Sequence, residues 1–176
     1  MSDHHKTWID AALHDLSASI YLHEGRYWFQ ATLNAQQAGE KLGKAILIYS
    51  GVAAADIRLF SHRILKINEK IEALGLHTFS EIDQNMARKM QRAYIEQKYP
   101  NESSDDAPYV LFDRIESEDS IQWALNYLDM TMHVIPEVAL MHERNSLQQS
   151  FDHAKIVANT CMACHSAPCV CRKPKG

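Results

Sequence analysis

Hydrophobic residues recur at steps of three and four along most of the first 147 residues, which is the period of an α-helix. The clearest stretch runs from Ala35 to Tyr49, where apolar positions alternate with Gln, Glu and Lys. Its apolar positions are Ala35, Ala38, Leu42, Ala45, Ile46 and Tyr49. This spacing places the apolar side chains on one side of a helix and the polar ones on the other. We therefore predict a long helix over about 26–49 with one buried side.

The segments on either side of this helix are predicted from the same period. Before it, apolar residues predict a first helix over about 8–24, with Thr7 and Asp10 as an N-terminal capping box. Gly25 follows, and we expect it to take a left-handed conformation at the helix end. After the long helix, residues 52–60 are expected to form a connection or a short helix.

Two more helices follow in the middle of the chain. One covers about 64–74 and ends near Gly75. The next is expected to begin at a cap formed by Thr78, with Glu81 reaching back to it. Pro100 should end this helix at about residue 98, because proline disfavours helical backbone in the residue before it.

A polar loop and a last helix complete the pattern. Residues 101–108 are rich in Asn, Ser, Asp and Pro, which are typical of turns. The last long helix should open near Ser117, and its apolar positions alternate in steps of four and three, a pattern suited to a bundle. Pro136 is expected to kink or interrupt it, and helix should resume to about Leu147.

Two glycines stand four apart in the long helix, at Gly39 and Gly43. Each lowers helix propensity by roughly 1 kcal/mol relative to alanine. A functional reason would be access of a ligand to the backbone. The reason we favour is close approach of another helix.

These patterns predict an all-α protein, an antiparallel up-and-down bundle of four to five helices with a Cys-rich C-terminal tail. Glycine and proline are scarce, and strand-type runs bounded by turns are absent. We place the bundle at 1–150 and a Cys/His-rich basic tail at 151–176.

Composition narrows the class of protein. The 176 residues are 46% hydrophobic and 23% charged, enough for one domain with a core. A net charge of −4 argues against a whole-protein electrostatic grip on nucleic acid, but leaves room for a local basic patch. The sequence shows neither a signal-peptide core nor an apolar run of spanning length, so we expect a cytoplasmic protein that does not bind a membrane.

The cysteines all lie after residue 160, so the bundle should hold no disulfide. Five candidate metal ligands gather in this tail, Cys161, Cys164, His165, Cys169 and Cys171. A Cys-x-x-Cys pair suits one edge of a tetrahedral zinc site. One interpretation is therefore a bound zinc ion held by three or four tail residues. The other is a disordered tail with reactive thiols and a basic end.

The long helix also carries a recognisable motif. Tyr27, Ala31 and the run AQQAGEKLGKA from Ala35 to Ala45 closely resemble the second-helix signature of HEPN domains, which reads roughly A-Q-Q-A-x-E-K-x-x-K-A.

Two further segments match the same family in the expected order. Residues 61–65 (SHRIL) resemble its third helix, which carries a histidine and a leucine. Residues 92–101 (RAYIEQKYPN) resemble its Y-I-x-x-R-Y-P-[DN] stretch, with Lys98 where arginine is usual. The resemblance covers about residues 5–147.

HEPN domains are four- to five-helix bundles that are often dimeric, and many are encoded beside small nucleotidyltransferases. One class consists of RNases, and another, which the Gln-Gln and Tyr-Pro motifs resemble, is thought to bind nucleotides or nucleic acid. The resemblance implies a ligand site on the polar side of the second helix and at the end of the fourth. Its candidate residues are Gln37, Lys41, Lys44, Arg92, Lys98 and Tyr99.

Elementary chemistry is compatible with that site. Lys41 and Lys44 lie three apart on one helix and can meet a phosphate, to which Arg92 and Lys98 would add charged donors. Tyr94 or Tyr99 could stack on a base.

The plainer interpretation of the same residues is a solvated helix surface. Glu40 and Lys44 form an i,i+4 pair worth about 0.2–0.5 kcal/mol at a surface. Gln37 and Lys41 would then face water, and Tyr99-Pro100 would only end a helix.

An RNase would need an arginine, a polar residue and a histidine in a fixed order, as ribonuclease HEPN domains have them. Here Arg58 and His62 stand closer together than that pattern requires, and Leu59 replaces the polar residue. Arg144 and Asn145 supply the polar neighbour, but His153 lies too far along.

The leading hypothesis is a non-catalytic nucleotide- or nucleic-acid-binding module, acting as a homodimer or beside a nucleotidyltransferase-type partner. The alternatives are a metal-independent RNase toxin of a toxin-antitoxin pair, for which Arg58 and His62 are weak candidates, and a protein-interaction module with a zinc-binding tail.

Overall fold

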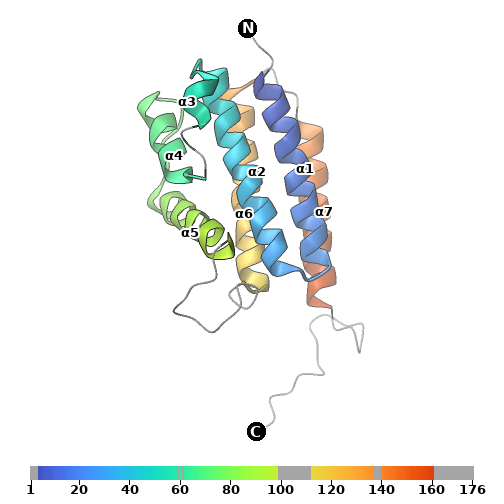
Figure 1. Cartoon of the computed structure of the whole chain (residues 1–176). Helices are drawn as coiled ribbons and strands as arrows, with labels where there is room; N and C mark the ends of the chain where they lie inside the picture. Colours follow the sequence, from blue (N-terminus) through green and yellow to red (C-terminus); the bar gives the residue numbers. More distant parts are fainter. Residues whose placement is uncertain (1–3, 59, 61, 99–111, 137–139, 161–176) are drawn as a thin grey trace.

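A computed structural model describes residues 4–58, 60, 62–98, 112–136 and 140–160. Helices account for most of these residues (Figure 1). They are α1 (His4–Glu24), α2 (Trp28–Tyr49), α3 (Ala54–Arg58), α4 (Ile64–Ala73), α5 (Glu81–Lys98), α6 (Arg114–Val134) and α7 (Met141–Asn159). No strand occurs in these ranges, so the predicted all-α fold is confirmed.

The long helices form an up-and-down bundle. α1 runs in one direction, α2 returns, α4 and α5 together form a bent third leg, α6 returns again and α7 runs beside α1 (Figure 1). If α4 and α5 are counted as one bent helix, the described part of the bundle has five long helices, in agreement with the predicted four to five helices. The short α3 occupies the segment expected to be a connection or a short helix.

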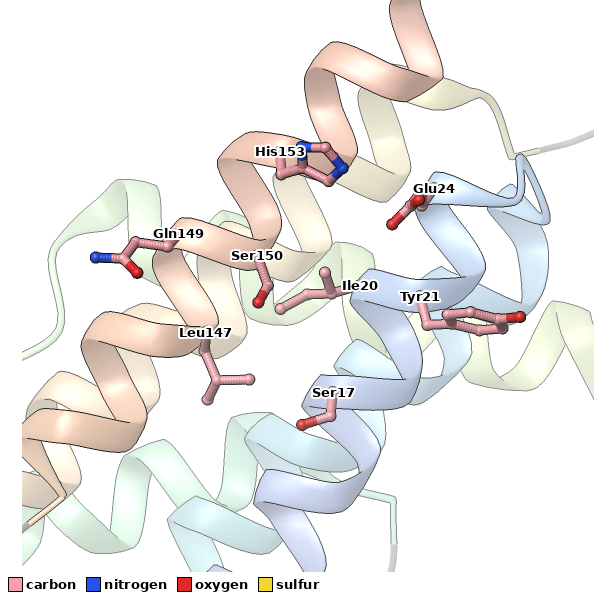
Figure 2. Close-up of a pocket in the computed structure, with 8 residues that line it drawn as sticks. All are labelled: Ser17, Ile20, Tyr21, Glu24, Leu147, Gln149, Ser150 and His153. Carbon is pink, nitrogen blue, oxygen red and sulfur yellow. The ribbon is translucent and has the colours of Figure 1, made fainter.

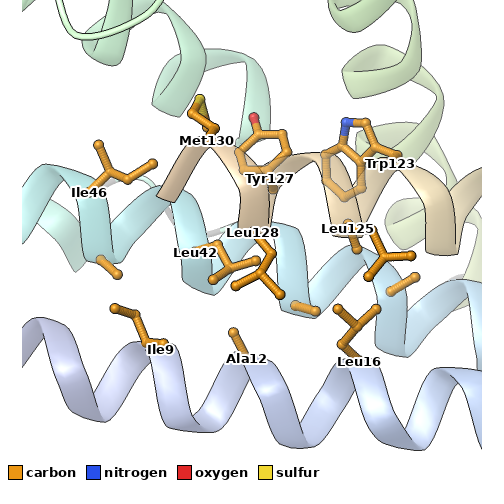
Figure 3. Packing of buried hydrophobic residues seen from close by; sticks show 14 of the residues in the cluster. Ile9, Ala12, Leu16, Leu42, Ile46, Trp123, Leu125, Tyr127, Leu128 and Met130 are labelled. Atoms are coloured by element: carbon orange, nitrogen blue, oxygen red, sulfur yellow. The ribbon is translucent and has the colours of Figure 1, made fainter. Parts of the chain in front are cut away.

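α2 is the central helix, because α1, α4, α5 and α6 all pack against it. Its apolar side is fully buried, with Leu42 and Ile46 each 0% exposed. Figure 3 shows these two side chains in one cluster with Ile9, Ala12 and Leu16 of α1 and Leu128 of α6. The predicted apolar stripe of this helix is therefore confirmed.

The glycines of α2 allow close contacts with α6 and α4. A Cβ atom at Gly39 would lie 2.3 Å from Cζ3 of Trp123 on α6. One at Gly43 would lie 2.6 Å from Cγ2 of Ile67 on α4. Such distances leave no room for a methyl group, so the packing explanation for both glycines is confirmed.

The boundaries of α1 differ from the prediction at both ends. The helix begins at His4, so Thr7 and Asp10 lie inside it and the predicted capping box is wrong. At the other end Arg26, with φ of 65°, takes the left-handed conformation expected of Gly25. The turn is a Schellman motif in which the Tyr27 N–H donates to the Leu22 carbonyl at 2.9 Å, and this places the left-handed residue one position later.

The caps of α5 and α6 also lie elsewhere than predicted. Ser80, not Thr78, caps α5, and its Oγ accepts from the Asp83 N–H at 3.2 Å. α6 begins at Arg114, ahead of Ser117, because Asp113 and Glu116 form a capping box there. In both helices a polar residue other than the predicted one satisfies the free N–H groups of the first turn.

α7 extends well beyond the predicted end near Leu147. It continues through Asn159 and buries Phe151, Ala154 and Ala158. The predicted boundary between bundle and tail at residue 150 therefore falls inside a helix of the bundle. The separate nature of the following tail remains a prediction.

None of the helices in the described ranges is long and apolar enough to cross a membrane.

Candidate functional site

The polar side of α2 carries a buried ion pair. Glu40 is 6% exposed and Lys44 is 7% exposed, and the Lys44 Nζ donates to Glu40 Oε1 at 2.5 Å. Gln36, one turn earlier, is 1% exposed and donates from Nε2 to Glu40 Oε2 at 3.2 Å. The i,i+4 pair predicted for Glu40 and Lys44 therefore forms, but in the interior and not at a solvated surface.

The same carboxylate holds the segment just before α4. The His62 backbone N–H donates to Glu40 Oε1 at 3.3 Å, and His62 Nδ1 lies 3.1 Å from Glu40 Oε2. Each carboxylate oxygen thus has two partners. His62 has φ of 56°, a left-handed conformation that is uncommon outside glycine. The contacts with Glu40 offset the cost of that conformation.

Tyr94 of α5 completes the arrangement. Its ring stacks on the His62 ring with centroids 3.8 Å apart and planes 18° apart, and its Oη lies 2.7 Å from His62 Nε2. Tyr94 is 6% exposed, whereas the His62 side chain is 41% exposed. One histidine ring therefore remains partly open to solvent while its partners are buried. We call Gln36, Glu40, Lys44, His62 and Tyr94 the Glu40 network.

Electrostatics favour an ionised Glu40. Burial by itself would raise the pKa of this carboxyl group, but the hydrogen bond and charge of Lys44, with a contribution from His62, bring the pKa below its ordinary value. An ionised carboxylate can only accept hydrogen bonds. The contact between His62 Nδ1 and Glu40 Oε2 therefore requires a proton on Nδ1. In neutral His62, Nε2 then accepts from the Tyr94 hydroxyl.

The predicted lysines point to different partners. The Lys44 ammonium group lies 5.2 Å from the centre of the Trp8 ring, in addition to its contact with Glu40. Lys41 forms an ion pair with Asp15 of α1, with about a quarter of its side chain exposed. The structure thus does not bring Lys41 and Lys44 together as two unpaired cations. Gln37 is half-buried beside them on α2.

The remaining predicted ligand contacts belong to the end of α5. Arg92 is exposed on this helix, two residues before Tyr94. Lys98 is the last residue of α5, and its side chain lies outside the described part, as does Tyr99. Their roles in ligand binding remain predictions.

The weak RNase pair can be placed only in part. Arg58 is the last residue of α3, and its side chain is outside the described part of the chain. Both ring nitrogens of His62 have partners in the protein, Glu40 and Tyr94.

The predicted zinc ligands, Cys161, Cys164, His165, Cys169 and Cys171, lie outside the described residues. Within the described ranges, no group of His, Cys, Asp and Glu side chains is arranged to hold a metal ion. Zinc binding by the tail therefore remains a prediction.

Sequence reasoning missed the organising role of Glu40 and the stacking of His62 on Tyr94. The i,i+4 spacing of Glu40 and Lys44 was visible, but nothing local shows that Glu40 would also contact His62, 22 residues further along the chain. Arg63, exposed beside His62, was also not singled out.

The fold and this network define a helical bundle with a buried charged centre on its second helix. The family model of the HEPN domain matches residues 5–134, and the chain belongs to that family. Membership suggests a module related to nucleotides or RNA. α7 lies after the matched residues.

Two solved structures share the fold. TT1696 from Thermus thermophilus is 20% identical, with a TM-score of 0.63, and the match covers 76% of this chain and all of that one. ST0689, an archaeal HEPN homologue, is 24% identical, with a TM-score of 0.53, and the match covers 72% of this chain and 93% of that one. Among curated proteins, none matches this chain.

Proposed function

We propose that this protein is a non-catalytic nucleotide- or nucleic-acid-binding module of the HEPN type. The observation that carries the proposal is the half-exposed His62 ring, stacked on buried Tyr94 and held by Glu40. A ring fixed in this way offers its outer face to a nucleobase without first losing conformational freedom. Base–aromatic stacking is typically worth about 1–3 kcal/mol per base.

Cations near this ring would bind the phosphate groups of the ligand. Arg63 is exposed next to His62, and Arg92 is exposed on the helix that carries Tyr94. Guanidinium groups suit phosphate because they donate two parallel hydrogen bonds. Gln37, Lys41, Lys98 and Tyr99 remain further candidates. Lys44 acts indirectly in this proposal, because its ammonium group neutralises Glu40.

The family resemblance extends the proposal to assembly. We propose a homodimer that works beside a nucleotidyltransferase-type partner, because HEPN domains are often dimeric and many are encoded beside small nucleotidyltransferases. Light scattering on the purified protein tests the first part, and a single mass equal to one chain at all concentrations would contradict it.

The RNase alternative is less well supported. A general base needs a ring nitrogen within reach of the 2′-hydroxyl proton, and both His62 nitrogens are engaged inside the protein. Incubation with single-stranded RNA followed by gel analysis distinguishes the two functions. Specific cleavage that is lost in His62→Ala would overturn the non-catalytic proposal.

A ligand screen tests the proposed binding. A ligand that binds only the native state must raise the melting temperature, so we expect an upward shift with a subset of nucleotides or with short RNA or DNA. Fluorescence anisotropy of a labelled oligonucleotide then gives the affinity. Arg92→Gln should weaken binding, whereas Arg88→Gln, an exposed arginine on the same helix, should not. Absence of any shift and any anisotropy change would contradict the proposal.

A further inference from the structure

A pocket lies between α1 and α7, away from the Glu40 network. Its volume is about 450 Å³, within the usual range of small-molecule sites. α1 and α7 run in the same direction here, so that Ser17 and Leu147 lie at one end and Glu24 and His153 at the other (Figure 2). The α1 residues of this pocket lie within the part of the chain that the HEPN family model matches, and its α7 residues lie after that part.

The floor of the pocket is apolar. Ile20 of α1 is 4% exposed and Leu147 of α7 is 9% exposed, and both line it. From Ser17 to Glu24 the pocket follows two turns of helix, a length of about 10 Å at 1.5 Å per residue. A ligand with a short extended alkyl chain matches this length and this floor.

The polar groups of the pocket lie at its rim. Ser17, Gln149 and Ser150 supply side-chain oxygens that can accept hydrogen bonds, and Glu24 supplies a carboxylate. The Glu24 side chain has no ion pair or hydrogen bond with any described residue. A carboxylate without a partner beside an apolar floor is a site for the ammonium group of a ligand.

The charges around the pocket favour a cation over an anion. Neither lysine nor arginine is among its lining residues. The nearby Arg26 donates to the Thr160 carbonyl, and Lys155 is paired with Asp152. α1 ends at Glu24, so the partial negative charge of its C-terminus adds to that of the carboxylate. His153, which faces Glu24 across the end of the pocket, is the titratable group on the opposite helix (Figure 2).

We propose that this pocket binds a short alkyl diamine. One ammonium group pairs with Glu24, the methylene chain covers Ile20 and Leu147, and the second amine donates to the Ser17 hydroxyl group at the opposite end. The ligand class follows from the order of groups along the pocket, which is carboxylate, apolar floor and hydroxyl. The proposal does not depend on nucleotide binding at His62.

Three five-carbon compounds that differ in their end groups test this order. Cadaverine carries two ammonium groups, pentanediol two hydroxyl groups and glutarate two carboxylates. Titrations of the full chain are followed through its amide NMR spectrum at low ionic strength. We expect cadaverine to shift the amides around Glu24 and Ser150 in a saturable way, and expect neither of the other compounds to do so. Equal shifts with pentanediol, or shifts with glutarate alone, would overturn the proposal.

Variants locate the site. Glu24→Gln keeps the shape and removes the charge, and should weaken cadaverine binding about fivefold, as expected for a partly exposed ion pair. Glu69→Gln makes the same change of net charge at an exposed position on α4 and should leave the affinity unchanged. Ser150→Leu fills the pocket without changing charge and should also weaken binding. If cadaverine binds the Glu24→Gln and Glu69→Gln proteins equally well, its contact is nonspecific and the proposal fails.

Discussion

The two sides of α2 hold their neighbours by different physical means. On the apolar side, Leu42 and Ile46 are packed from every direction, and the contacts depend on shape. On the polar side, Glu40 holds Lys44, Gln36 and His62 through hydrogen bonds and charge. The apolar side fixes where the helices lie. The polar side fixes one half-exposed ring, which requires directed bonds because packing alone sets no ring orientation.

The largest expected effect comes from breaking the polar side. Glu40→Ala leaves the Lys44 charge buried without a partner, and should lower the free energy of unfolding by about 3–5 kcal/mol. The double variant Glu40→Leu/Lys44→Met removes both charges and should recover most of that loss. Urea unfolding measures both. If the double variant were as unstable as the single one, the network would be a requirement of the fold and not of a site.

The apolar side is tested by Leu42→Ala. This side chain is 0% exposed, so the cavity should cost about 2–5 kcal/mol. Ile82→Ala is the matched control, because Ile82 is 80% exposed on α5 and its truncation should change stability by about 0.5 kcal/mol or less. Ligand affinity of the folded Leu42→Ala protein should be unchanged. A specific loss of affinity would show that the two sides of α2 are coupled.

The close approach of α2 and α6 is tested by Gly39→Ala. The added methyl group meets the Trp123 ring, and overpacking of this kind costs about 1–3 kcal/mol. Better helix propensity returns roughly 1 kcal/mol of it. A double-mutant cycle with Trp123→Leu measures the clash, since the smaller side chain should relieve it. A stabilising Gly39→Ala substitution would contradict the packing explanation.

Acid should weaken the polar side selectively. The native pKa of Glu40 lies below its ordinary value of 4.5, so the unfolded chain binds the proton first as pH falls. The stabilisation by Glu40 is complete above the pKa of the unfolded chain. It is lost as the pH falls through the lower pKa of the folded protein. Unfolding free energies measured from pH 7 downward should fall more steeply for the natural protein than for Glu40→Leu/Lys44→Met. Parallel curves would show that the pKa of Glu40 is the same in the folded and the unfolded protein.

The smallest effect is expected at Lys41. Its pair with Asp15 is partly exposed, so Lys41→Met should cost about 0.2–1 kcal/mol. Asp15→Asn breaks the same pair and leaves Lys41 in place. If Lys41 contacts the ligand, only Lys41→Met weakens nucleotide or oligonucleotide binding. Equal affinity of both variants would remove Lys41 from the proposed site.

Local patterns predicted the helices well because an amphipathic helix with one buried face has apolar residues at a period of about 3.6 in its sequence. The apolar stripe of α2, the end of α4 at Gly75 and the break before Pro136 follow from such patterns. The last helix extends further than predicted. Its later apolar residues, Phe151 and Ala154, stand among polar ones, so the periodic pattern is weak there.

The candidate site was predictable only in part, because it depends on contacts between distant segments. The sequence predicts that Glu40 and Lys44 lie on the same face of a helix, but on that basis we expected a solvent-exposed pair. The tertiary partners of the pair come from other segments, Trp8 for Lys44 and His62 for Glu40, and Tyr94 packs in turn on His62. The family resemblance implied a site on α2 and at the end of α5. It did not predict that the His62 ring connects these two helices.

The central claim is that the polar side of α2 holds His62 as a surface for a nucleobase. Its most direct test is the affinity of the best ligand from the nucleotide and oligonucleotide screen for His62→Ala, measured beside His142→Ala as an exposed control. Loss of one stacked base should weaken binding by roughly 5- to 150-fold, the equivalent of about 1–3 kcal/mol. His142→Ala should bind as the natural protein does. An unchanged affinity of folded His62→Ala would contradict the claim.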